Sequence, residues 1–115
     1  MTVVKQIAQT LVQLCRAWKF PEAQATLFHE DAVNLEPDGR TTTGLAAIMA
    51  KEQAFLHSIT ERHLLEISDP VVADEYFAVQ LLMDVTINGI GRRTRNDLCI
   101  YKVHGGKIIH EQFFY

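Results

Sequence analysis

The chain has 115 residues, of which 48% are hydrophobic, and its formal net charge is −3 at pH 7. This length predicts one domain, residues 1–115, that buries roughly two thirds of its unfolded surface and needs no disulfide or metal ion to fold. The slightly acidic balance argues against nucleic-acid binding, and the basic run at residues 92–95, beside a glycine-containing turn, is typical of a solvated hairpin end.

The cysteines and the start of the chain indicate a compartment. Cys15 and Cys99 stand in apolar periodic segments and form no CxxC pair, so we expect reduced, packed thiols. No stretch approaches the 18 apolar residues of a membrane span, and residues 1–11 lack the pattern of an export signal. These features predict a cytoplasmic protein without a membrane partner.

The first half of the chain predicts three helices. Apolar residues at steps of three and four indicate one over residues 3–18. A second, short helix restarts near residue 20, where Pro21 suits the first turn because its missing N–H costs nothing there. Residues 32–36 predict a brief strand, which a turn at residues 37–39 and a polar loop at residues 40–43 follow. A third helix is expected over residues 44–59, with Thr43 as its N-cap.

The second half alternates as strands do. Residues 62–68 and 71–73 are two runs separated by Pro70, and residues 76–88 predict a long strand with one apolar face. Asn88-Gly89 and Gly105-Gly106 are hairpin signals, so the last three strands should form an antiparallel meander. Helices followed by strands, with no βαβ alternation, predict the α+β class: a curved antiparallel sheet covered by three N-terminal helices as a cone with an interior pocket.

Two carboxyl groups fall among apolar neighbours in the last two expected strands. Because successive side chains alternate sides, Asp97 and Glu111 each share a face with hydrophobic residues. The companions are Cys99, Tyr101 and Val103 in the first strand, and Ile109, Phe113 and Tyr115 in the second. A carboxyl group on a core-facing stripe must be paired, protonated or open to a water-filled cavity, so the pattern predicts acids that line a pocket.

Three segments carry a resemblance to a known superfamily: residues 26–33 (TLFHEDAV), residues 36–39 (EPDG) with residues 44–48 (GLAAI), and residues 105–111 (GGKIIHE). In order and spacing the chain resembles the nuclear transport factor 2-like superfamily, and most of all its SnoaL-like and ketosteroid isomerase-like small proteins. The resemblance covers essentially the whole chain and implies a cystatin-like cone. Function in this superfamily ranges from isomerases, cyclases and dehydratases to binding modules, so the fold does not fix it.

The resemblance also implies catalytic residues. Glu36 falls where ketosteroid isomerases hold the carboxylate that shuttles a proton, and Asp97 falls near their neutral oxyanion-hole acid. Those enzymes have a second oxyanion-hole donor, a tyrosine in the first helix. The matching position here is Val12, so the resemblance does not extend to steroid isomerisation. We therefore expect proton transfer on an apolar carbonyl compound through Glu36 and Asp97, without a cofactor or a metal ion. The alternative for Glu36 is a solvated turn residue with a structural role.

A cone would let some apolar residues wall the pocket rather than fill the core. The expected ligand-binding residues are Trp18, Phe28, Met49, Phe55, His63, Met83, Tyr101, Glu111, Phe113 and Tyr115. The alternative is that the aromatic and methionine side chains are core, and that His63 is a hydrogen-bonded core histidine. Such a pocket prefers a small apolar molecule with carbonyl or hydroxyl groups.

The opposite face of the expected sheet is too apolar for free solvent. It carries Tyr76, Gln80, Leu82, Ile100 and Phe114. We expect a homodimer through this open face. Two further alternatives stay open for the function as a whole: a ligand-binding domain without chemistry, and a protein-interaction domain, which a sealed cone would favour.

Overall fold

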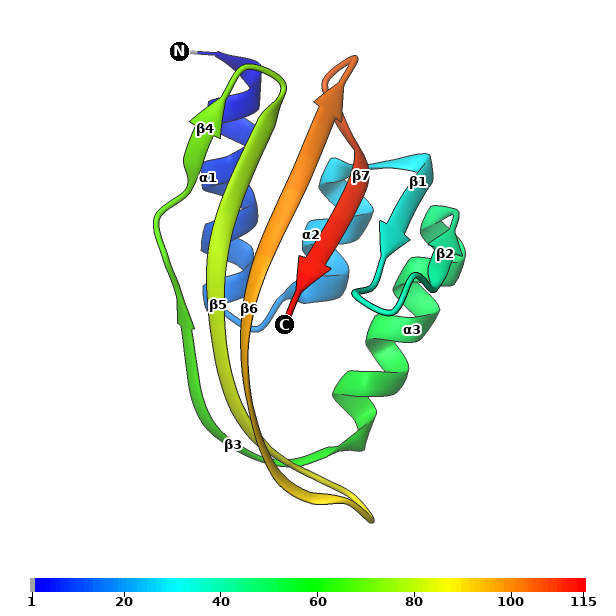
Figure 1. Cartoon of the computed structure of the whole chain (residues 1–115), viewed down its shortest axis with the longest axis vertical. Helices are drawn as coiled ribbons and strands as arrows, with labels where there is room; N and C mark the ends of the chain where they lie inside the picture. The colour runs from blue at the N-terminus through cyan, green and yellow to red at the C-terminus, as the bar shows by residue number, and fades with distance from the viewer. Residues whose placement is uncertain (1) are drawn as a thin grey trace.

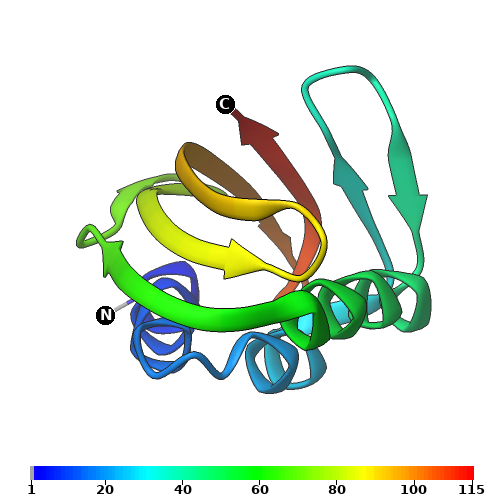
Figure 2. The ribbon, with the colours of Figure 1, turned by 90° about the horizontal axis from the view of Figure 1, so that it is seen from below.

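The computed structural model describes residues 2–115, which form three helices and one seven-stranded sheet. The elements are α1 (Val3–Arg16), α2 (Phe20–Leu27), β1 (Phe28–Leu35), β2 (Thr41–Thr43), α3 (Leu45–Ser58), β3 (Ile59–Ile67), β4 (Val71–Ala73), β5 (Tyr76–Ile87), β6 (Gly91–His104) and β7 (Lys107–Phe114). The helices lie along one side of the bent sheet, as Figures 1 and 2 show. The expected α+β cone is confirmed.

The strand order is β2-β1-β7-β6-β5-β3, and β4 also pairs with β5. β5, β6 and β7 form the expected antiparallel meander. β1 and β7 are parallel, so the sheet is mixed and not wholly antiparallel. No hairpin joins these two strands, which are distant in sequence, and nothing local therefore imposes the antiparallel direction.

The helices begin and end for local reasons. The Thr2 hydroxyl caps α1 by accepting a hydrogen bond from the backbone N–H of Lys5, and Pro21 occupies the first turn of α2. The expected N-cap of α3, Thr43, is wrong: Gly44 takes that position with a φ of +94° and offers no side-chain cap. Only glycine adopts this backbone conformation without strain.

The first hairpin differs from its prediction. β1 begins at Phe28, four residues earlier than expected, and the expected polar loop at residues 40–43 contains β2, which pairs antiparallel with β1. The turn at residues 37–39 reverses the chain tightly, and Glu36 and Arg40 are hydrogen bonded through their backbones across it. The three threonines that follow suit a short edge strand.

A bulge near the start of β7 corrects another expectation. Val103 pairs with Ile108 and Lys102 pairs with His110, which leaves Ile109 as an extra residue on β7. Ile108 is therefore the fully buried residue, and Ile109, which alternation placed on the core face, is only partly buried. After the bulge, Glu111 returns to the inner face.

The core lies between the helices and the inner face of the sheet. Tyr101 stacks on Phe77 with ring centroids 4.8 Å apart and meets Phe28 edge-on.

Over residues 2–115, the structure contains no helix with the length and apolar character needed to cross a membrane.

Candidate functional site

A cavity of about 370 Å³ lies between the helices and the inner face of the sheet. This volume falls in the range of roughly 300–1,000 Å³ that is typical of small-molecule sites. Its walls are mostly apolar, and exposed residues such as Lys51 and Arg93 are part of its lining, so the cavity reaches the surface. The cone is not sealed by side chains.

Most of the predicted site residues line this cavity. They are Glu36, Asp97, Phe28, Phe55, Met83, Tyr101, Glu111 and Phe113. Tyr115 is not part of the wall, but its hydroxyl donates a 2.7 Å hydrogen bond to Glu36.

Three predicted ligand-binding residues lie away from the cavity wall. The ring of Trp18 packs beneath the guanidinium group of Arg62, at 4.4 Å. Met49 is partly buried on α3, and Nε2 of His63 lies 2.7 Å from the Thr86 hydroxyl. The expectation that these three wall the pocket is wrong: Trp18 lies in the turn between α1 and α2, and His63 lies where the pairing register of β3 shifts.

Glu111 is a buried acid of the site, with only 5% of its surface exposed. Burial raises its pKa to about 8, and the nearby charge of Glu52 adds to the rise, whereas hydrogen bonds with Asn34 and Tyr101 act in the opposite direction. The Glu111 carboxyl group is therefore mostly protonated at neutral pH and can donate a hydrogen bond into the cavity.

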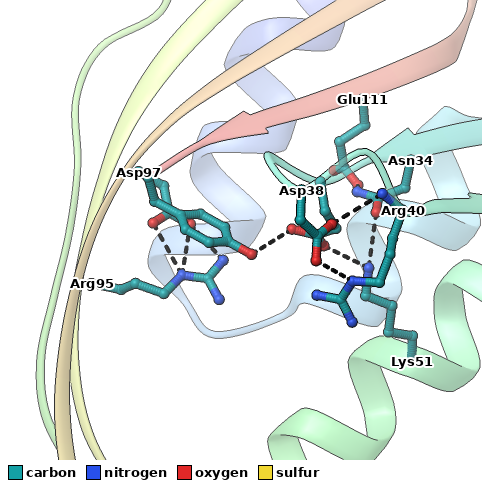
Figure 3. Close-up of polar contacts among 9 residues, drawn as sticks. Asn34, Asp38, Arg40, Lys51, Arg95, Asp97 and Glu111 are labelled. Carbon is teal, nitrogen blue, oxygen red and sulfur yellow. Dashed lines mark hydrogen bonds and ion pairs between the residues drawn. The ribbon is translucent and has the colours of Figure 1, made fainter.

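Glu36 follows directly after β1 and is 7% exposed. Burial would raise its pKa, but hydrogen bonds from Lys51 and Tyr115, 2.6 and 2.7 Å long, outweigh this effect and lower the pKa. Glu36 is thus a carboxylate at neutral pH. The turn that presents it is fixed further by a salt bridge between Arg40 and Asp38 (Figure 3).

Asp97 lies on the inner face of β6 and is 3% exposed. The guanidinium group of Arg95 donates three hydrogen bonds to its two carboxylate oxygens, at 2.7 to 3.0 Å. Arg95 also covers the ring of Tyr115, with 4.1 Å to the centroid. The basic run at residues 92–95 is therefore not wholly a solvated hairpin end, because Arg95 turns inward to pair with a buried acid.

A series of hydrogen bonds connects the two glutamates across the cavity wall (Figure 3). Nζ of Lys51, on α3, donates to Glu36 and also to Oδ1 of Asn34, at 2.9 Å. Nδ2 of Asn34 then donates to Glu111 at 2.8 Å. An ionised and a neutral carboxyl group thus share one network.

Sequence reasoning missed several polar residues of this wall: Gln24, Asn34, Lys51, Glu52 and Arg95. Glu52 is partly buried on α3, and burial raises its pKa in spite of the nearby charges of Arg95 and Lys51. Its position four residues after Ile48 on the apolar stripe of α3 is a signal that could have found it.

The thiols are packed, as expected. Cys15 and Cys99 are free, buried and part of the cavity wall, and burial raises the pKa of Cys15 to about 12. Among residues 2–115, no three His, Cys, Asp or Glu side chains are grouped so that they could hold a metal ion.

The family model of the SnoaL-like domain matches residues 1–115. The chain belongs to the SnoaL-like domain family. None of the curated proteins compared with this SnoaL-like domain matches it.

Solved structures agree with this membership. A Mesorhizobium loti protein proposed to be a SnoaL-like polyketide cyclase is 28% identical, with a TM-score of 0.90 and full coverage of both chains. An NTF2-like protein of unknown function from Burkholderia pseudomallei K96243 is 15% identical, with a TM-score of 0.80, over 100% of this chain and 92% of that one. A hypothetical protein with a ketosteroid isomerase-like fold from Catenulispora acidiphila DSM 44928, in complex with trimethylamine, is 22% identical, with a TM-score of 0.68, over 83% of this chain and 74% of that one. The resemblance stated from the sequence is confirmed for this SnoaL-like domain.

Proposed function

We propose that this SnoaL-like domain binds a small, mostly apolar molecule and moves a proton at a carbon atom next to its carbonyl group. The observation that supports this proposal is the pairing, on one cavity wall, of an ionised Glu36 with a neutral Glu111. Two carboxyl groups whose environments set opposite protonation states are suited to act as base and acid.

The proposed step balances without a further reactant. A carboxylate oxygen of Glu36 takes the proton, the C–H bond breaks, and its electron pair moves onto the carbonyl oxygen as an enolate. The O–H of Glu111 donates a hydrogen bond to that oxygen from a buried position on a mostly apolar wall, where such a bond is worth more than in water. Glu36 then returns the proton to the same carbon atom or to another one, which gives exchange or isomerisation. If the same molecule carries a second carbonyl group, the enolate carbon atom can instead bond to that carbonyl carbon, the C=O π bond breaks, and its oxygen takes the proton from Glu36, which is the corresponding cyclase outcome.

The roles of the acids differ here from those that the resemblance implies. Both oxygens of Asp97 accept hydrogen bonds from Arg95, so Asp97 has no donor to offer an oxyanion. Glu111 is the better candidate for the neutral acid. We assign Asp97 the role of a positioning residue that holds Arg95 at the cavity wall.

A ligand-binding domain without chemistry is the second candidate, and one observation favours it. Both oxygens of Glu36 already accept hydrogen bonds, one from Lys51 and one from Tyr115, which weakens Glu36 as a base. In this alternative the same network fixes a ligand, and Glu36 takes no proton.

Deuterium exchange into 2-tetralone, a bicyclic ketone with acidic C–H bonds beside its carbonyl group, separates the two candidates. We expect the domain to accelerate exchange in D₂O, followed by NMR. Glu36→Gln, which removes the base, and Glu111→Met, which removes the hydrogen-bond donor, should both slow it on the order of 100-fold. Glu66→Gln, a matched change at an exposed strand position, should leave the rate unaltered. Binding of 2-tetralone with no exchange above the buffer rate would leave only the binding role.

We also propose that the outer sheet face binds a second copy of the chain. Tyr76, Leu98 and Phe114 each expose between 44 and 46% of their surface there. Leu98 pairs with both Gln80 and Phe114, so these side chains form one continuous patch over β5, β6 and β7. A self-complementary apolar face of this kind suits a two-fold dimer.

A further inference from the structure

Gln24 is a polar residue in an apolar part of the cavity wall. It lies on α2, one helical turn before Phe28, and is only 8% exposed. Its neighbours on the same wall include Phe20, Ala23 and Phe28. Within residues 2–115, its Oε1 is the one buried side-chain nitrogen or oxygen atom that lacks a hydrogen-bond partner.

The other buried polar residues of the cavity do not share this property. Asn34, Glu36, Asp97 and Glu111 all have side-chain partners within 3.0 Å. A buried amide without a partner lowers stability, and a methionine or leucine would fill the same space on α2 at no such cost. The fold therefore gives no reason for an amide at position 24.

The geometry points to a specificity role: we propose that Gln24 binds a hydroxyl group of the ligand, at a point removed from the carbonyl group that Glu111 contacts. This inference rests on the ligand-binding part of the proposed function. Gln24 belongs to the helical wall, whereas Glu36 and Glu111 belong to the sheet wall of the same cavity. A hydroxyl group can both donate and accept, so it satisfies the amide in either orientation.

The ligand class follows from the arrangement of these groups. The same cavity is also lined by Leu11, Val79, Met83 and Cys99, which offer no strong hydrogen bond. The ligand should therefore be a compact apolar ring system that carries a carbonyl group on one side and a hydroxyl group on another. Hydroxylated bicyclic ketones have this chemistry.

Calorimetric titration with four ketones tests the inference: 2-tetralone and its 5-, 6- and 7-hydroxy derivatives. We expect at least one hydroxy derivative to bind the natural chain on the order of tenfold more tightly than 2-tetralone, as one additional hydrogen bond allows. Gln24→Met should abolish this advantage and leave 2-tetralone binding unaltered or tighter. Gln53→Met, at an exposed position of α3, should retain the advantage.

Thermal unfolding of the free protein tests whether Gln24 has a structural role instead. If Gln24 is kept for a ligand, Gln24→Met leaves the Tm unchanged or raises it. A Tm that falls by several degrees would overturn the inference, as would a hydroxyl advantage that is absent in the natural chain or persists in Gln24→Met.

The two proposals fail in different ways. A hydroxyl advantage that depends on Gln24, without any deuterium exchange, supports this inference and rejects the catalytic role. Deuterium exchange, with no hydroxy derivative binding more tightly than 2-tetralone, rejects only this inference. If none of the four ketones binds, both proposals are rejected.

Discussion

Asn34 and Glu111 are paired twice: they are register partners in the parallel β1–β7 ladder, and their side chains form a 2.8 Å hydrogen bond. The orientation of the Asn34 amide is fixed because its oxygen accepts from Lys51. Its NH₂ group must therefore face Glu111. This bond favours the ionised form of Glu111 and keeps its pKa from rising further.

Replacing Asn34 by leucine should raise the pKa of Glu111 above about 8, because a donor to the carboxylate is lost while burial remains. Titration of the glutamate side-chain carbons by NMR measures this shift. Asn96→Leu, at an exposed position of β6, is the control and should not move it. An unchanged titration in Asn34→Leu would show that the amide does not influence Glu111.

The stability of the protein should decline as the pH rises from about 5 to about 8. Below the ordinary pKa of 4.5 the Glu111 carboxyl group is protonated in both folded and unfolded chains. Between 4.5 and about 8 only the unfolded chain releases this proton, so the free energy of unfolding falls by about 1.4 kcal/mol per pKa unit of difference.

Glu111→Gln removes this titration. We expect chemical denaturation to show a smaller loss of stability for Glu111→Gln than for the natural chain between pH 5 and 8. Glu36 acts in a different window: its pKa is lowered, so its contribution is lost only as the pH falls below 4.5. Parallel curves for the two proteins between pH 5 and 8 would contradict a raised pKa for Glu111.

Arg95→Met should destabilise the fold by about 2 kcal/mol, because it leaves the Asp97 carboxylate buried without its charged partner. The side chain of Asp97 is 4% exposed, but that of Arg95 is 47% exposed, so the loss is smaller than for a fully buried pair. Arg92→Met is the control on the same strand. The side chain of its partner, Asp84, is 15% exposed and that of Arg92 is 63% exposed, so this pair is more open to water and the Tm should change less. Equal effects of the two substitutions would argue against a buried ion pair at Asp97.

Tyr115→Phe should raise the pKa of Glu36, because the phenol hydroxyl is one of the donors that lower it. In the deuterium-exchange assay this appears as an acidic limb shifted to higher pH. Tyr76→Phe, an exposed tyrosine on β5, is the matched control. A profile that does not differ between the two variants would remove Tyr115 from the site.

Leu98→Lys should convert a dimer into a monomer in analytical ultracentrifugation, because it places a charge at the centre of the outer apolar patch. Ile90→Lys provides the comparison: Ile90 is 58% exposed, at the hairpin tip beyond the patch. A natural chain that sediments as a monomer would reject the dimer.

Alternation and turn signals were sufficient to predict the sheet meander, since the Asn88-Gly89 and Gly105-Gly106 turns fix the register of the strands that they join. They could not predict the parallel β1–β7 pairing or the bulge at Ile109, because both depend on contacts between segments distant in sequence. The inward position of Asp97 and Glu111 followed from the same alternation.

Arg95 precedes Asp97 by two residues on the same strand face, and Gln24 follows Phe20 by four on the same helix face, so both were accessible to pattern analysis. The protonation states were not, because they depend on partners such as Lys51 and Asn34 that tertiary structure brings together.

Lys51 connects α3 to β1 through Glu36 and Asn34, and only one of these two partners is an anion. When Glu36 accepts a proton, its attraction for Lys51 weakens. One of the two contacts by which Lys51 connects α3 to β1 is then weaker. Protonation of Glu36 would thus leave the neutral amide of Asn34 as the stronger remaining partner of Lys51, and the electrostatic link between α3 and the end of β1 would be reduced to one hydrogen bond between uncharged and charged groups.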